Sequence, residues 1–170
     1  MNTSPTLPAW NADDAAGSLA ACAAWFGSKA RETFLNDKTH GEMFFFWDAK
    51  GEMGAAQPPP GIERNQLTAV VKAEIERLQV YGVVHIAEAW MYLPKQKNDH
   101  TYKQVVQGEI AVSQLKPEDR TETLMVRMES RDGLSRIWLS PIVRSADSVA
   151  LGDTIEISDP AGGGSGSFFN

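Results

Sequence analysis

The sequence predicts a single α+β domain with a mainly antiparallel five-stranded sheet and two main helices. Its 170 residues are one domain's worth of chain. Two segments repeat apolar side chains at three- and four-residue spacing, which predicts helices. Short β-rich segments separated by turn residues predict strands joined mostly as hairpins. We expect the domain to cover residues 11–158, after an extended lead-in (1–10) and before a Gly/Ser-rich tail (159–170).

The first half of the chain predicts a helix, a hairpin and a second helix. Residues 13–35 carry a helical stripe behind acidic residues that suit the positive end of a helix dipole. Residues 42–47 are too short and too aromatic for a helix, so they predict a strand that turns at 48–51 into a short return strand, 52–57. In the second helix five apolar residues are expected to face the sheet: Leu67, Val70, Val71, Ile75 and Leu78.

The second half predicts three strands. Residues 83–93 are apolar on both faces, which indicates a central strand. Residues 121–130 alternate and turn at Arg131-Asp132-Gly133 into a partner strand, 134–143, while 154–157 are a candidate edge strand. The connection 94–118 has weak periodicity and far exceeds the usual length of roughly 4–6 residues. We therefore predict that it carries function or an interface.

The resulting order, αββαβββ, resembles that of profilin-like and roadblock-like domains, in which helices pack on a five-stranded antiparallel sheet. The resemblance rests on element order and covers the whole expected domain. Such an analogy implies a fold and leaves the chemistry to be argued from a site.

Charge and cysteine content exclude several classes of function. Sixteen basic and 22 acidic residues give a net charge of −6, and no segment is basic enough to favour a nucleic acid backbone. A single cysteine, Cys22, excludes an intramolecular disulfide and a cysteine-rich metal site. The N-terminus lacks a leader pattern and no apolar run could span a membrane, so we expect a cytoplasmic protein without a bound cofactor.

A motif in the predicted central strand carries a family resemblance. Residues 83–145 resemble a group of small bacterial and phage-borne proteins that have a Val-Ser-Glu-Ala-Trp-Met strand, a loop with Pro, Asp and Arg, and a hairpin. The resemblance implies a bacterial or phage origin and a topology, while no function is established for the group. Ala87 stands where the group has Ser, which removes a serine nucleophile. The matching residues are Glu88, Ala89, Trp90, Met91, Pro117, Asp119, Arg120 and the hairpin around Asp132-Gly133 and 141–144.

Glu88 is the most informative candidate, because it shares one strand face with Trp90 and apolar neighbours. It would be either a general acid or base in a pocket or, by the interpretation we favour, one member of a structural ion pair with Arg120, Arg127, Arg136 or Arg144. His85 lies three residues away and should point to the opposite face, so no metal-binding spacing results. The candidate binding residues are Glu88, Trp90, His85, His100, Arg120 and Trp138.

These observations favour a non-catalytic binding module, a homodimer or accessory subunit, acting through a sheet face or the loop 94–119. One alternative is a small hydrolase that uses Glu88 with a nearby His or Arg. Another is a phage-encoded inhibitor of a host protein. We also predict that Phe168 and Phe169 dock in a groove of this chain or of a second copy, because they are the apolar groups at the end of a linker-like segment.

Overall fold

The computed structural model describes residues 6–158 and 167–169. The expectations for the first five residues and for the Gly/Ser-rich run 159–166 lie outside the described residues. The helices are α1 (Ala15–Asp37), α2 (Arg64–Arg77) and the short α3 (His100–Val106). The strands are β1 (Met43–Trp47), β2 (Met53–Ala56), β3 (Gly82–Met91), β4 (Thr121–Ser130), β5 (Ser135–Arg144), β6 (Val149–Leu151) and β7 (Ile155–Ser158).

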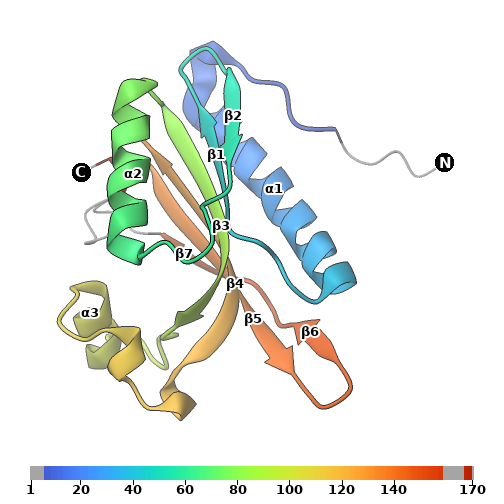
Figure 1. Ribbon diagram of the computed structural model, residues 1–170, viewed down its shortest axis with the longest axis vertical. Coiled ribbons are helices and arrows are strands. Elements are labelled where there is room, and N and C mark those ends of the chain that lie inside the picture. Colours follow the sequence, from blue (N-terminus) through green and yellow to red (C-terminus); the bar gives the residue numbers. More distant parts are fainter. Residues whose placement is uncertain (1–5, 159–166, 170) are drawn as a thin grey trace.

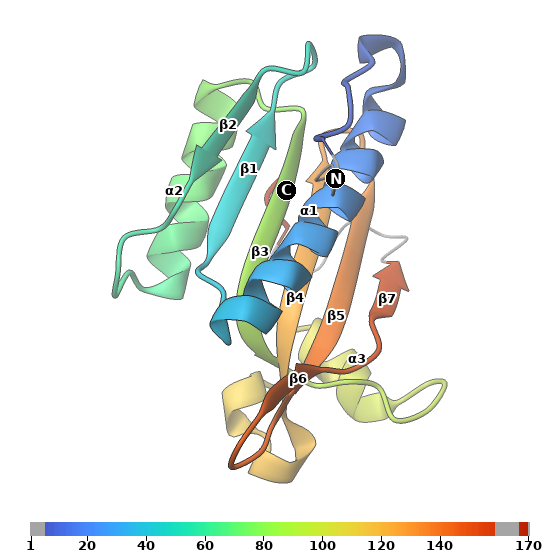
Figure 2. The ribbon, with the colours of Figure 1, turned by 90° about the vertical axis from the view of Figure 1, so that its right-hand side faces the viewer.

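The strands form one antiparallel sheet, which separates α1 from α2 (Figures 1 and 2). Its order is β2-β1-β3-β4-β5-β6, and β7 pairs with another part of β5. The α+β class and the antiparallel sheet are confirmed. The prediction of five strands in the order αββαβββ is wrong, because α3 and β6 are additional elements within the described chain and the candidate edge strand 154–157 is formed as β7.

The face under α1 holds the larger apolar core. Leu19, Ala23 and Phe34 of α1 pack against β3 and β4 residues such as Ile86 and Met128. Gly82 permits this close approach, since a Cβ there would lie 2.5 Å from a methyl group of Leu19. In the segment before α1, the ring of Trp10 stacks on Trp47 with 6.2 Å between ring centroids. The N-terminal segment is thereby anchored to this face.

The face under α2 holds a second core, and α2 covers it incompletely. Leu67, Val71 and Ile75 are buried against apolar residues of β1 and β3. Val70 and Leu78, which were expected to join the same stripe, are 53% and 48% exposed. The prediction is wrong for these two residues because the sheet beneath them ends at the four-residue edge strand β2.

The connection from β3 to β4 is more ordered than its sequence indicates. It contains α3 and two short 3-10 turns, Val112–Gln114 and Pro117–Asp119. Buried Asp99 organises its start by accepting hydrogen bonds from Tyr92 Oη (2.8 Å), Lys95 N (2.9 Å) and Tyr102 N (3.2 Å). The last of these bonds caps α3, and all three hold the pKa of Asp99 below its usual value.

Two other sequence predictions are confirmed. β3 is central, pairing with β1 on one side and with β4 on the other. β4 and β5 form the expected hairpin, and Gly133 supplies the positive φ of 91° that its turn needs. In the part of the chain that the structure describes, no helix has both the length and the apolar character needed to cross a membrane.

Candidate functional site

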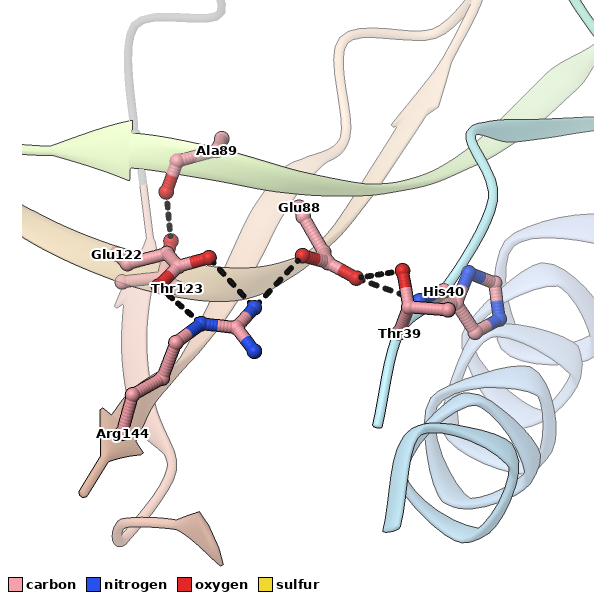
Figure 3. Close-up of polar contacts among 7 residues, drawn as sticks. All are labelled: Thr39, His40, Glu88, Ala89, Glu122, Thr123 and Arg144. Carbon is pink, nitrogen blue, oxygen red and sulfur yellow. Dashed lines mark hydrogen bonds and ion pairs between the residues drawn. The ribbon is translucent and has the colours of Figure 1, made fainter. Parts of the chain in front are cut away.

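Glu88, near the C-terminal end of β3, belongs to a polar network (Figure 3). Its Oε1 accepts hydrogen bonds from Thr39 Oγ1 (2.9 Å) and from the backbone N–H of His40 (2.5 Å). Its Oε2 lies 3.3 Å from Nη2 of Arg144. Both carboxylate oxygens are therefore engaged, as in the ion pair of the structural interpretation.

Arg144 joins Glu88 to a second carboxylate. Its Nε and Nη2 donate to the two oxygens of Glu122 at 2.8 and 2.7 Å, a bidentate arrangement. Arg144 holds the pKa of Glu122 below its usual value, and Glu122 raises the pKa of Arg144. Nε and Nη2 of the guanidinium are thus held by two carboxylates, one on β3 and one on β4, and the network joins three neighbouring strands.

Trp90 and Arg120 meet beside this network. They line a shallow open bowl together with Glu122, Ile142 and Arg144. Trp90 is 58% exposed, the largest exposed fraction among the bulky apolar residues of the described chain. Trp90 and Arg120, two of the candidates from sequence, therefore share one surface. Glu88 does not line this surface but is ion-paired with Arg144, which does.

His85 lies on the opposite face of the sheet, as strand alternation predicts. Its Nε2 is 2.7 Å from Oε1 of Glu42, which also receives Arg64 Nη1 at 2.8 Å. Burial lowers the pKa of His85 and outweighs the opposing effect of Glu42, so the ring is neutral at pH 7. The hydrogen bonds from His85 and Arg64 hold the pKa of Glu42 below its usual value.

The remaining candidates lie apart from Glu88. Exposed His100 begins α3, and Trp138 lines a small pocket under α1 of about 180 Å³. Arg31 closes that pocket by donating hydrogen bonds to Ser140 and Thr154. Neither His85 nor His100 joins Glu88. The histidine that does contact Glu88 is His40, through its backbone N–H, and the neighbouring arginine is Arg144. Within residues 6–158 and 167–169, no group of three His, Cys, Asp or Glu side chains could hold a metal ion.

Another hollow, about as large as the Trp90 bowl, was not expected from the sequence. A groove of about 600 Å³ lies between β2 and α2. Its floor is apolar, formed by Phe44, Phe46, Leu67, Val71 and Val80. One sequence signal could have located it: the apolar stripe of α2 is wide. When such a stripe is wider than the sheet beneath it, some of its apolar residues stay exposed beside the sheet edge.

The fold and this groove define a small α+β protein with an antiparallel sheet, a helix on each face and an apolar groove at one sheet edge. No family model, curated protein or solved structure matches the chain. Its function must therefore be argued from its own residues.

Proposed function

We propose that this chain is a non-catalytic interaction module that binds an extended apolar segment of a partner protein in the groove between β2 and α2. The observation that carries the proposal is that the groove's rim is apolar and exposed. Met53, Val70 and Leu78 line it and are 46%, 53% and 48% exposed. Contiguous exposed apolar surface of this kind marks binding sites in proteins that otherwise bury such residues.

The edge strand β2 favours an extended ligand. Within the described chain it pairs with β1 alone, and all four of its residues are exposed. Gly54 has no side chain, and Ala55 and Ala56 have small ones, so these residues leave the outer backbone edge accessible to an added strand. Alternate side chains of that strand would point to the groove floor, which selects apolar residues there.

The charges of the groove favour a basic residue at one end of the ligand. Its charged lining residues are all acidic: Asp48, Glu52 and Glu74. Glu74 is already paired with Arg77, so Asp48 and Glu52, at the hairpin end, supply the attraction. We therefore expect a segment with alternating apolar residues flanked by Lys or Arg.

The proposal is preferred over the hydrolase alternative because the carboxylate of Glu88 is engaged on both oxygens by Thr39, His40 and Arg144. The connection 94–119 and the Trp90 bowl stay a second candidate surface, since Trp and Arg often dominate protein interfaces. Inhibition of a host protein would be one biological use of either surface. A homodimer is an outcome that the experiment below distinguishes.

The test is selection of random ten-residue peptides on the full chain, followed by affinity measurements with two matched variants. Val70→Asp places a charge on the groove rim, and Val143→Asp makes the same change at a residue that is 56% exposed but lies on β5. We expect the selected peptides to have alternating apolar residues and a basic end. Compared with the unchanged chain, Val70→Asp should bind them at least tenfold more weakly, and Val143→Asp should bind them equally well. Amide shifts in NMR should fall on β2 and α2.

Two results would overturn the proposal. One is that no peptide is selected, or that Val70→Asp binds the selected peptides as the unchanged chain does. The other is a dimer by sedimentation that Val70→Asp converts to a monomer, which would show that a second copy fills the groove.

A further inference from the structure

The C-terminal residues Ser167, Phe168 and Phe169 cover the other side of α2. Phe168 is 7% exposed and belongs to the apolar cluster under α2, with Phe169 packed against that cluster. The ring of Phe168 meets the rings of Phe44 and His85 edge-on, with centroids 5.8 and 5.9 Å apart. Docking of the two aromatic residues in a groove of this chain is thus confirmed.

The floor beneath this segment is ionic, unlike an ordinary core. Glu129 Oε2 accepts hydrogen bonds from Phe168 N (2.8 Å) and Ser167 Oγ (3.0 Å). Glu129 also forms an ion pair with Arg127, whose guanidinium carbon lies 5.0 Å from the centroid of Phe168. Glu129 and His85 are both 3% exposed. The aromatic residue is therefore recognised by its ring and its backbone N–H together.

With Phe168 in place, some buried polar atoms around it have no hydrogen-bond partner among the described residues. Nδ1 of His85 and Nε of Arg127 have no hydrogen-bond partner in the described chain. Because Nε2 of His85 donates to Glu42, Nδ1 carries the lone pair and is an acceptor, whereas Nε of Arg127 is a donor. Buried polar groups without partners are costly, so a ligand that satisfies them would bind better than the chain's own segment.

Release of the segment is favoured by the same features. Removing it returns water to Glu129 and Arg127, and hydration of these charges offsets part of the lost aromatic contact. The nine residue steps from Ser158 to Ser167 could span up to roughly 30 Å if extended, so the segment can leave while β7 stays paired.

We propose that Ser167-Phe168-Phe169 is a displaceable ligand supplied by the chain itself, and that the pocket beneath it is a second recognition site, for a peptide that presents an aromatic side chain with its backbone N–H. This site goes beyond the groove of the proposed function: His85, Arg127 and Glu129 belong to it and do not line the groove, while Phe44 contributes to both. A competing peptide with a hydroxyl or amide side chain beside its aromatic residue would also satisfy His85 or Arg127.

The test uses the full chain with Phe168 and Phe169 both replaced by Ser, and a fluorescent peptide Gly-Ser-Gly-Ser-Phe-Phe-Asn. We expect the variant to bind this peptide, to ignore a peptide with Ser-Ser in place of Phe-Phe, and to bind at least tenfold more tightly than the unchanged chain, in which the pocket is occupied. Adding Glu129→Gln should weaken binding about tenfold. Adding Glu122→Gln, the matched change on the other sheet face, should not alter it.

Folded variant protein that does not bind the Phe-Phe peptide would overturn the proposal. If the double variant does not fold, hydrogen exchange of the unchanged chain decides. Exchange of the Phe168 amide at least tenfold faster than that of β3 amides supports a releasable segment, and equal protection shows a permanent core element. Adding Val70→Asp should leave this binding unchanged, so failure of the groove proposal would be distinguishable.

Discussion

On one side of α2 the sheet face is apolar and open, and on the other it is charged and covered by the chain's own C-terminal residues. The open side is the groove floored by Phe44 and Phe46. The covered side has Arg127 and Glu129 under Phe168. In a sheet that served core formation alone, we would expect the apolar side to be covered and the charged side to be open. Burial of apolar surface is favourable in free energy, whereas burial of charged groups is costly. This difference is what we expect if each side binds a segment from outside the folded domain, as the two proposals require.

The largest loss of stability is expected for a substitution at Phe44, because this residue contributes to both regions. Phe44 is 2% exposed, lines the groove, stacks on His85 at 4.2 Å between centroids and contacts Phe168. Replacing it by Ala should lower the free energy of unfolding by about 3–5 kcal/mol, the range for a buried Phe. Urea unfolding measures this loss. A loss below about 1 kcal/mol would mean that the two regions do not share a packed core.

Phe168→Ala should cost less than Phe44→Ala although both rings are buried. We expect about 1–2 kcal/mol, because the lost burial is offset by the freedom that Ser167–Phe169 regain and by hydration of the ionic floor. The same urea titration compares the two variants. Equal losses would place Phe168 in the permanent core and contradict the comparison.

The smallest expected effect concerns the ionic floor and appears as a pH dependence. Because burial lowers the pKa of His85 from 6.5, the unfolded chain binds the proton first as the pH falls. The contribution of His85 is therefore complete above about pH 6.5 and is lost as the pH falls through its lower folded pKa. Glu42 stays ionised through the upper part of this window, since its folded pKa lies below 4.5.

His85→Gln removes this titrating ring and keeps a side chain that can donate to Glu42. We expect its stability to decline less than that of the unchanged chain between pH 6.5 and 5, as measured by urea unfolding at each pH. The same decline in both proteins would show that another group titrates.

The candidate site shows what a sequence can and cannot supply. Alternation along β3 correctly placed Glu88 and His85 on opposite faces, because the side-chain period of a strand is fixed by its backbone. It could not choose the partner of Glu88 among four arginines. Arg144 is the partner because β5 runs beside β4, and pairing across strands joins residues 56 positions apart.

The sequence by itself determined the α+β class, the central strand and the two hairpins, all of which follow from local periodicity and turn residues. It also indicated an apolar stripe on α2 and an aromatic pair at the C-terminus. Tertiary structure alone decided that Val70 and Leu78 stay exposed, that Asp99 organises the connection after β3, and that Phe168 covers Glu129. The physical reason is that backbone geometry fixes which residues share a face, whereas the cover of that face depends on segments distant in the chain.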